Sequence, residues 1–135
     1  MNLEHNDIEE GVIGGFHPSL VKLNLSYNHM RVFPISLTTL VNLQEISLNS
    51  NRLTDITGVE SLVSIISIEL DDNLLTELIV DWKQLNQLKF LSVKNNRLLK
   101  HSTSNPEVQS ISSDLFLFTN IDRLDLHGNV GLSKR

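Results

Sequence analysis

Hydrophobic residues recur along this chain with a fixed spacing. The clearest copy, residues 43–53, reads Leu-Gln-Glu-Ile-Ser-Leu-Asn-Ser-Asn-Arg-Leu, with apolar side chains at its positions 1, 4, 6 and 11 and an asparagine at position 9. Residues two apart in a β-strand point to the same side. Positions 4 and 6 therefore predict a short strand with a buried face, and positions 3, 5 and 7 are expected to face outward.

The same pattern recurs through the whole sequence, which predicts a repeat architecture. A partial copy with Leu3 and Ile8 at positions 6 and 11 opens the chain, and the last copy has Gly131 at position 11. The separations between successive position-9 asparagines are 22, 23, 22, 23 and 33 residues. These asparagines are Asn6, Asn28, Asn51, Asn73, Asn96 and Asn129.

This pattern resembles the leucine-rich repeat family, L-x-x-L-x-L-x-x-N-x-L, over nearly the whole chain. The resemblance implies an α/β solenoid: a curved right-handed superhelix with short parallel strands on the concave face and a helical, 3₁₀ or irregular convex side. The segment Phe33-Pro34-x-x-Leu37-x-x-Leu40 resembles the typical 23-residue class. The next repeat, residues 43–64, is similar to the 22-residue class of intracellular phosphatase regulators.

The length of 135 residues predicts one domain. We divide it into a partial repeat 1–19, repeats 20–42, 43–64, 65–87 and 88–120, and a partial repeat 121–135. In residues 1–19, three glycines within five residues disfavour a helix, and Val12, Ile13 and Phe16 are the expected core contacts. Trp82 aligns with Leu37 and is expected to be a core residue of the convex side.

The fourth repeat is ten residues too long, with an insertion near residues 100–110. Asn105-Pro106-Glu107 has the composition of a helix start, with a capping residue, a proline and then an acid. Apolar residues follow at helical spacing, which predicts a polar loop and then a convex helix over about 106–119. Those residues are Val108, Ile111, Leu115 and Phe118.

The position-9 asparagines are expected to form a structural ladder. A buried asparagine needs partners for one acceptor and two donors, and backbone groups of its own and the adjacent coil can supply them. Replacing one by an apolar residue would leave those groups unsatisfied, at about 1–3 kcal/mol each. Asn49, at position 7, is expected to point to solvent instead.

The outward positions define a candidate partner-binding face. Glu69, Asp71 and Asp72 of the third repeat form an acidic centre, with Glu45 on the neighbouring strand. The aromatic residues Tyr27 and Phe90 flank this centre. Three readings stay open: an ordinary solvated face with Asp71 paired to Lys94, an acidic patch that suits a basic segment of a partner protein, and a divalent metal site. The candidate residues are Tyr27, Glu45, Glu69, Asp71, Asp72, Phe90, Lys94 and Arg123.

Charge and composition exclude several functions. The formal net charge of −5 argues against nucleic acid or anionic membrane as the main partner. There is no cysteine, hence no disulfide framework or thiolate metal site, and the five histidines show no ligand spacing. No signal peptide, membrane-spanning run or glycine-rich phosphate loop is apparent. We expect no cofactor, no metal and no catalytic residue.

The resemblance implies a non-catalytic protein–protein interaction module that binds another protein on its concave face. Such modules act as intracellular, cytoplasmic scaffolds, adaptors or regulatory subunits, and the lack of cysteine-rich caps favours that setting. One alternative is a sensor or recognition segment of a larger receptor or kinase; another, an enzyme, has no supporting residue set. Because neither end resembles a dedicated cap, we expect a fragment of a longer protein or end-to-end self-association.

Overall fold

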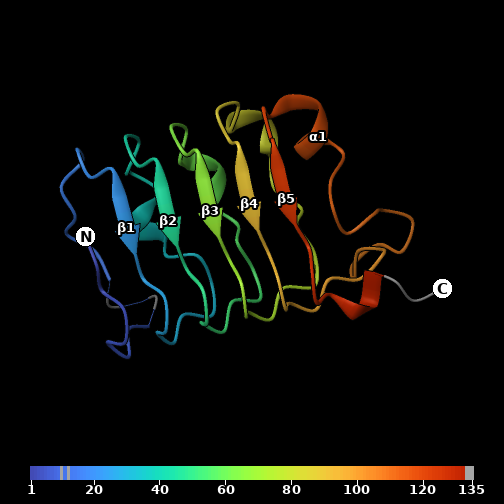
Figure 1. Ribbon diagram of the computed structural model, residues 1–135, viewed down its shortest axis with the longest axis horizontal. Helices are drawn as coiled ribbons and strands as arrows, with labels where there is room; N and C mark the ends of the chain where they lie inside the picture. Colours follow the sequence, from blue (N-terminus) through green and yellow to red (C-terminus); the bar gives the residue numbers. More distant parts are fainter. Residues whose placement is uncertain (10, 12, 133–135) are drawn as a thin grey trace.

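The computed structural model describes residues 1–9, 11 and 13–132, apart from the side chain of Phe118. Short strands alternate with short helical turns, once per repeat (Figure 1). The elements are β1 (Lys22–Asn24), η2 (Ile35–Leu37), β2 (Glu45–Ser47), η3 (Val59–Ser61), β3 (Ser67–Glu69), η4 (Trp82–Gln84), β4 (Phe90–Ser92), α1 (Asp114–Phe118), β5 (Arg123–Asp125) and η5 (Val130–Leu132).

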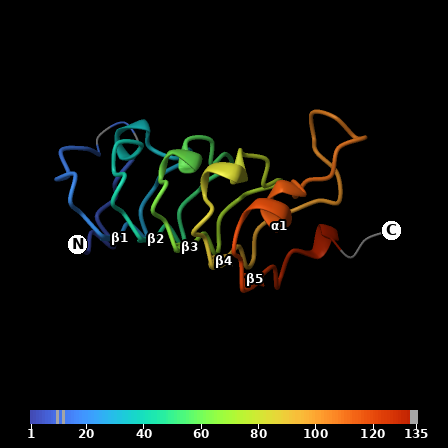
Figure 2. The ribbon, with the colours of Figure 1, turned by 90° about the horizontal axis from the view of Figure 1, so that it is seen from above.

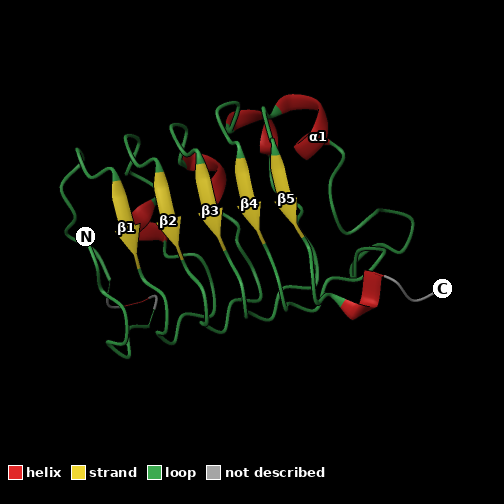
Figure 3. Cartoon of the chain, in the orientation of Figure 1, coloured by secondary structure: helices red, strands yellow, loops and turns green. Residues whose placement is uncertain are grey.

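The five strands form one parallel sheet in chain order, β1 to β5 (Figure 3). Each strand consists of positions 3–5 of its repeat, and position 4 pairs with position 4 of the next coil, as Leu23 does with Ile46. Successive strands are parallel and joined by crossovers that coil round a common interior (Figure 2). This arrangement confirms the α/β solenoid that the resemblance to leucine-rich repeats implied.

The core lies between the sheet and the convex turns. The apolar side chains at positions 4, 6 and 11 of the first four full coils are buried, as the pattern predicted. Helical turns η2, η3, η4 and α1 close the opposite side (Figure 2). Trp82 of η4 is fully buried, and its indole N–H donates to Leu78 O at 3.1 Å. Its predicted role as a convex-side core residue is therefore confirmed.

The predicted helix over residues 106–119 is wrong in its first half. The helix begins only at Asp114, because the preceding residues pair with other segments. His101 and Gln109 form an antiparallel bridge, so the insertion is a hairpin-like loop. Asn105 caps a turn at its tip, where its Oδ1 accepts from Glu107 N at 3.1 Å, and Val108 is exposed.

The convex side of the fourth coil resumes at Ile111, which forms a parallel bridge with Leu78. Leu115, four residues later, is fully buried, in the place that Trp82 takes four residues after Leu78. The extra residues are therefore accommodated before Ile111, as a protruding loop, and the solenoid itself continues without a break. The predicted convex helix is therefore present only from Asp114 on, with Leu115 buried and Ile111 partly buried against the core.

The N-terminal segment covers the first strand. Asn2 forms a parallel bridge with Asn24, and Leu3 N donates to Asn24 O at 2.8 Å. Ile13 and Phe16 are partly buried against the core, as expected. The third expected contact of this segment, Val12, lies outside the described residues.

Candidate protein-binding face

Five of the six position-9 asparagines form a buried ladder of hydrogen bonds. In the third coil, Asn73 Nδ2 lies 2.9 Å from Leu48 O of the preceding coil and 3.1 Å from Leu70 O of its own. Its Oδ1 accepts from Leu53 N at 3.0 Å. Asn28, Asn51, Asn96 and Asn129 repeat this arrangement. We call these rungs the inner ladder.

Asn6 differs from the other five asparagines because it is exposed. Its side-chain amide donates to Glu4 O at 3.1 Å, within its own turn. Its backbone N–H donates to Asn28 Oδ1 at 2.9 Å, so the segment is still held by the next rung.

A second series of hydrogen bonds, the outer ladder, runs along position 7 on the concave face. Ser26 Oγ accepts from Asn49 N at 3.1 Å, and Asn49 Oδ1 accepts from Asp71 N at 2.8 Å. Asp71 Oδ1 in turn accepts from Lys94 N at 2.8 Å. Each side chain thus binds the backbone of the next coil. Lys94 has no acceptor to offer, and His127 N bonds instead to Asp125 Oδ1 of its own coil at 3.2 Å.

Sequence reasoning missed the outer ladder, although its signal is present. Three consecutive coils have Ser26, Asn49 and Asp71 at position 7, and all three side chains carry an oxygen that can accept a hydrogen bond. The expectation that Asn49 points to solvent is wrong: the residue is only partly exposed, and its Oδ1 is in use.

The position between the two ladders is left-handed in every coil. Tyr27, Ser50, Asp72 and Asn95 have φ between 55° and 58°, and Gly128 has φ of 82°. In this conformation the chain turns away from the strand direction, so the position-8 side chains lie at the edge of the sheet. Tyr27 and Asp72 are exposed there.

The acidic centre divides into engaged and accessible carboxylates. Glu69 accepts from Ser47 Oγ, and Asp71 accepts from Ser92 Oγ at 2.6 Å as well as from Lys94 N. Lys94 Nζ also lies 3.9 Å from Asp71 Oδ2. Asp72, by contrast, is exposed. Among Glu69, Asp71 and Asp72 the accessible acid is therefore Asp72, and Asp71 is built into the fold.

The two candidate aromatic residues each have a neighbour from an adjacent coil. The Tyr27 ring stacks on His5 with centroids 4.5 Å apart, and more than half of Tyr27 is exposed. The Arg123 guanidinium lies over the Phe90 ring, 5.4 Å from its centroid. Phe90 pairs in register with Ser67, whose small side chain leaves that side of the ring open. Phe90 itself is half-buried. Aromatic and arginine side chains are enriched among binding hot spots.

Glu45 pairs with Lys22 on the neighbouring strand, at 3.2 Å between Oε2 and Nζ. Both side chains are more than half exposed, so a partner can exchange this ion pair for its own at little cost. The structure thus brings all eight candidate residues onto the same sheet face or its edge. It does not gather them into a pocket.

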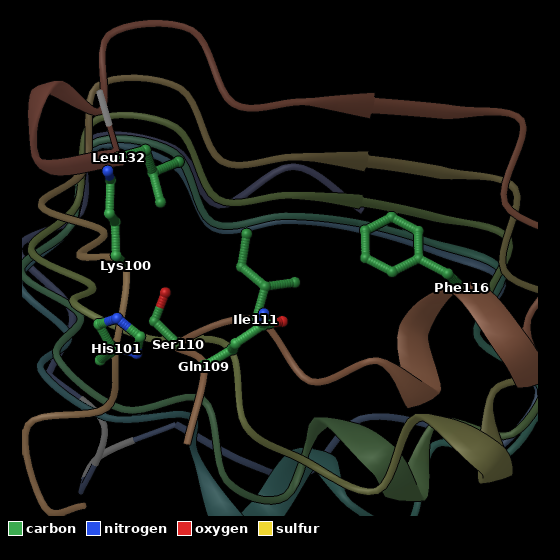
Figure 4. Close-up of a pocket in the computed structure, with 7 residues that line it drawn as sticks. All are labelled: Lys100, His101, Gln109, Ser110, Ile111, Phe116 and Leu132. Carbon is green, nitrogen blue, oxygen red and sulfur yellow. The ribbon is translucent and has the colours of Figure 1, made fainter. Parts of the chain in front are cut away.

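An apolar recess of about 360 Å³ opens toward the C-terminal end of the solenoid (Figure 4). Ile111, Phe116 and Leu132 point into the space between the sheet and the convex segment, and Lys100 and His101 lie at its edge (Figure 4). Leu124 and Leu126 of the last coil are only partly buried. Within the described residues, the last coil is therefore less completely buried than the coils before it.

Two further properties concern the described part of the chain. Nowhere among these residues do three or more acidic, histidine or cysteine side chains gather as ligands of a metal ion would. None of its helices has the length and apolar character required to cross a membrane.

Comparison with known proteins identifies relatives. A family model described as "Leucine Rich repeats (2 copies)" matches residues 18–62. A probable serine/threonine-protein kinase of Dictyostelium discoideum, pats1, is 31% identical over 114 residues, which are 79% of this chain and 3% of the kinase. The chain thus spans a small fraction of the length of the curated relative it matches.

Solved structures show the same fold. A leucine-rich repeat protein of Leptospira interrogans is 31% identical, with a TM-score of 0.62, and the match covers 80% of this chain and 31% of that protein. Internalin C2 of Listeria monocytogenes is 25% identical, with a TM-score of 0.60, over 77% of this chain and 40% of that protein. Folds of this class serve as protein-binding modules. The repeats, the parallel solenoid and these similarities together show that the chain belongs to the leucine-rich repeat superfamily.

Proposed function

We propose that this chain is a non-catalytic interaction module that binds a partner protein on the face of its five-stranded sheet. One observation carries the proposal: this face presents exposed groups that the fold does not use. The two ladders engage side chains of positions 7 and 9, whereas Tyr27 and Asp72 are exposed and Phe90 is half-buried, with part of its ring accessible to a partner. Aromatic side chains with a charged neighbour are the composition typical of interface anchors.

The chemistry of this face suits a basic segment of the partner. Asp72 is exposed, and Glu45 pairs with the exposed Lys22. An arginine or lysine of the partner could lie over Ser67, which stands between Glu45 and Phe90 in the register, and so pair with Glu45 beside the Phe90 ring. Because exposed charges are screened within about 8–10 Å at physiological ionic strength, we expect the affinity to fall as salt is added.

Affinity capture tests the proposal with two matched double variants. The concave variant is Asp72→Asn with Phe90→Ser; the convex control is Asp81→Asn with Phe116→Ser, which removes an exposed acid and a phenylalanine from the other side. Both spare the ladders. A partner recovered with the wild-type chain should bind the control equally well when purified and should lose affinity for the concave variant. Equal binding to both variants, or cross-links confined to the insertion or the convex side, would contradict the proposal.

A second function has a specific observation in its favour. The curated relative is a probable kinase, and the chain matches 3% of it. The same face would then recognise a ligand or another domain as a segment of a larger receptor or kinase, instead of acting as a scaffold, adaptor or regulatory subunit. The kinase similarity also supports an intracellular setting. Binding of the concave face to a purified kinase domain, absent in the concave variant, would favour this alternative.

A further inference from the structure

The insertion in the fourth coil is firmly held against the third coil. Ser102 N donates to Val108 O at 2.7 Å, which closes the hairpin. Leu78 N donates to Ser110 O at 2.6 Å, and Ser110 is almost fully buried. The insertion therefore has a defined place on the solenoid. It stands on the side away from the strand face (Figure 2, orange).

A cleft of about 310 Å³ lies where this insertion meets the loops of the second and third coils. The insertion supplies one wall, and Thr103 N donates to Glu77 Oε2 at 3.2 Å across its edge. Pockets that hold small molecules or side chains begin at about 300 Å³. The lining includes Thr54, Asp55, Thr76, Glu77, Ile79 and Thr103.

The cleft is rich in hydrogen-bond acceptors and has no basic side chain in its lining. Asp55 Oδ1 accepts from Thr57 N at 2.8 Å and from Thr57 Oγ1 at 2.6 Å, which leaves Oδ2 for another donor. Glu77 Oε2 likewise accepts from Thr103 N of the insertion, which leaves Oε1 for another donor. Neither carboxylate forms an ion pair within the described residues. The exposed side chain of Ile79 gives the cleft an apolar wall.

We propose that this cleft is a second binding site, separate from the sheet face, which receives an arginine or lysine side chain of a partner protein. Such a side chain combines an apolar stem with a cationic head that only donates hydrogen bonds. The stem would lie along Ile79 and the head would bind the open carboxylate oxygens of Asp55 and Glu77, with Thr76 as a further acceptor. Hydrogen bonds between ionised groups are about twice as strong as neutral ones.

The insertion is what distinguishes this place from the corresponding loops of the other coils. Asp55 and Glu77 occupy equivalent positions, four residues after the position-9 asparagine, and lie on neighbouring coils. Thr103 and Ser104 of the insertion form the outer wall of the cleft. Without this wall, Asp55 and Glu77 would be two acids on an open surface. The added loop converts them into the two sides of a cleft, and this gives the insertion a role.

Titration of the isotopically labelled 135-residue chain with a blocked Gly-Arg-Gly peptide, followed by backbone amide shifts, tests the proposal. We expect saturable shifts at Thr76, Glu77 and Thr103, and much smaller ones with the peptide in which neutral citrulline replaces arginine. Glu77→Gln keeps an acceptor for Thr103 N but removes the charge, and should weaken arginine-peptide binding about tenfold, which corresponds to about 1.4 kcal/mol. Asp55→Asn should act in the same direction.

Glu60→Gln is the matched control, because Glu60 is also partly buried and accepts a backbone N–H, from Gly58 at 3.0 Å, outside the cleft. It should leave peptide binding unchanged. Equal affinity for the citrulline peptide, shifts confined to the strand face, or saturable shifts with glucose but not with the arginine peptide would each overturn the proposal. So would arginine-peptide binding that neither Glu77→Gln nor Asp55→Asn reduces.

Discussion

The inner and the outer ladder use the same kind of hydrogen bond in different surroundings. Every buried rung of the inner ladder is an asparagine, because a side chain enclosed by backbone groups has to donate and accept at once. The outer ladder only has to accept a single N–H per coil, and serine, asparagine and aspartate all do so. Burial thus dictates the residue type at position 9, whereas position 7 is free to vary, and at Lys94 the outer ladder ends.

This difference decides which concave residues are available for binding. A polar residue on the sheet face can be structural although it is partly exposed, as Asp71 is. A test of binding that replaces Asp71 together with its neighbours would confuse lost affinity with lost stability. The four predictions below compare the two ladders and their surroundings in order of decreasing effect.

The largest effect is expected from Asn73→Leu. The change leaves Leu53 N without its acceptor inside the core. Leu48 O and Leu70 O each lose one donor, although Asn51 and Asn96 still donate to them. A buried orphan group costs about 1–3 kcal/mol and each further lost hydrogen bond about 1 kcal/mol, so the loss is a large fraction of the roughly 5–15 kcal/mol that stabilises a domain. Urea unfolding should show a much lower midpoint or no cooperative transition.

Asn49→Leu is the matched control from the outer ladder. It removes the acceptor of Asp71 N at a partly exposed position. The free energy of unfolding should therefore fall by about 1 kcal/mol. If Asn49→Leu and Asn73→Leu lowered the free energy of unfolding equally, the distinction between the ladders would be wrong.

Asp71→Leu should have the second largest effect. Ser92 Oγ and Lys94 N both lose their acceptor, and Ser92 is buried, so we expect a loss of about 2–3 kcal/mol. Asp71→Asn retains an oxygen at the same place and should cost much less. Urea unfolding of both variants separates the contributions: an Asn variant as unstable as the Leu variant would mean that the charge, through Lys94, matters more than the hydrogen bonds.

Gly128→Ala tests the left-handed column between the ladders. Gly128 has φ of 82°, and an added Cβ would lie 3.1 Å from Asn95 N and too close to the Asn95 side chain. The left-handed conformation costs a residue with a Cβ about 1–2 kcal/mol, and thermal unfolding should reveal a loss of that size. An unchanged melting temperature would show that the last coil adjusts freely.

The regular coils could be predicted from sequence because one spacing determines both the strand and its buried face. Leu23, Ile46, Ile68 and Leu91 pair in the predicted register. The left-handed column has a mixed signal in the sequence: Asp72, Asn95 and Gly128 are residue types that favour positive φ, whereas Tyr27 and Ser50 are not. Only the backbone turn that every coil repeats imposes it.

The insertion was harder to predict because its local signals are ambiguous. Asn105-Pro106-Glu107 suits a helix start and a tight turn equally well. Its helical spacing from Val108 to Ile111 is a coincidence: Val108 is exposed, and Ile111 belongs to the resumed coil. The tertiary hydrogen bonds of Leu78 with Ser110 and Ser112 decide the outcome, and no local pattern reveals them. The candidate face and the pairing of Asp71 with Lys94 followed from the register, but not the hydrogen bonds that Asp71 accepts from Ser92 Oγ and Lys94 N.

The smallest effect is expected from the exposed ion pair of Lys22 and Glu45. Its atoms lie 3.2 Å apart, yet both side chains are more than half exposed, and pairs of this kind contribute about 0–1 kcal/mol. Lys22→Met should therefore leave the urea midpoint nearly unchanged, in contrast to every ladder variant. The side chains of Lys22 and Glu45 belong to neither ladder, so the change removes no ladder hydrogen bond. A loss as large as that of Asp71→Leu would mean that Glu45 is held in place by the fold. Glu45 would then no longer count among the groups that the concave face offers to a partner.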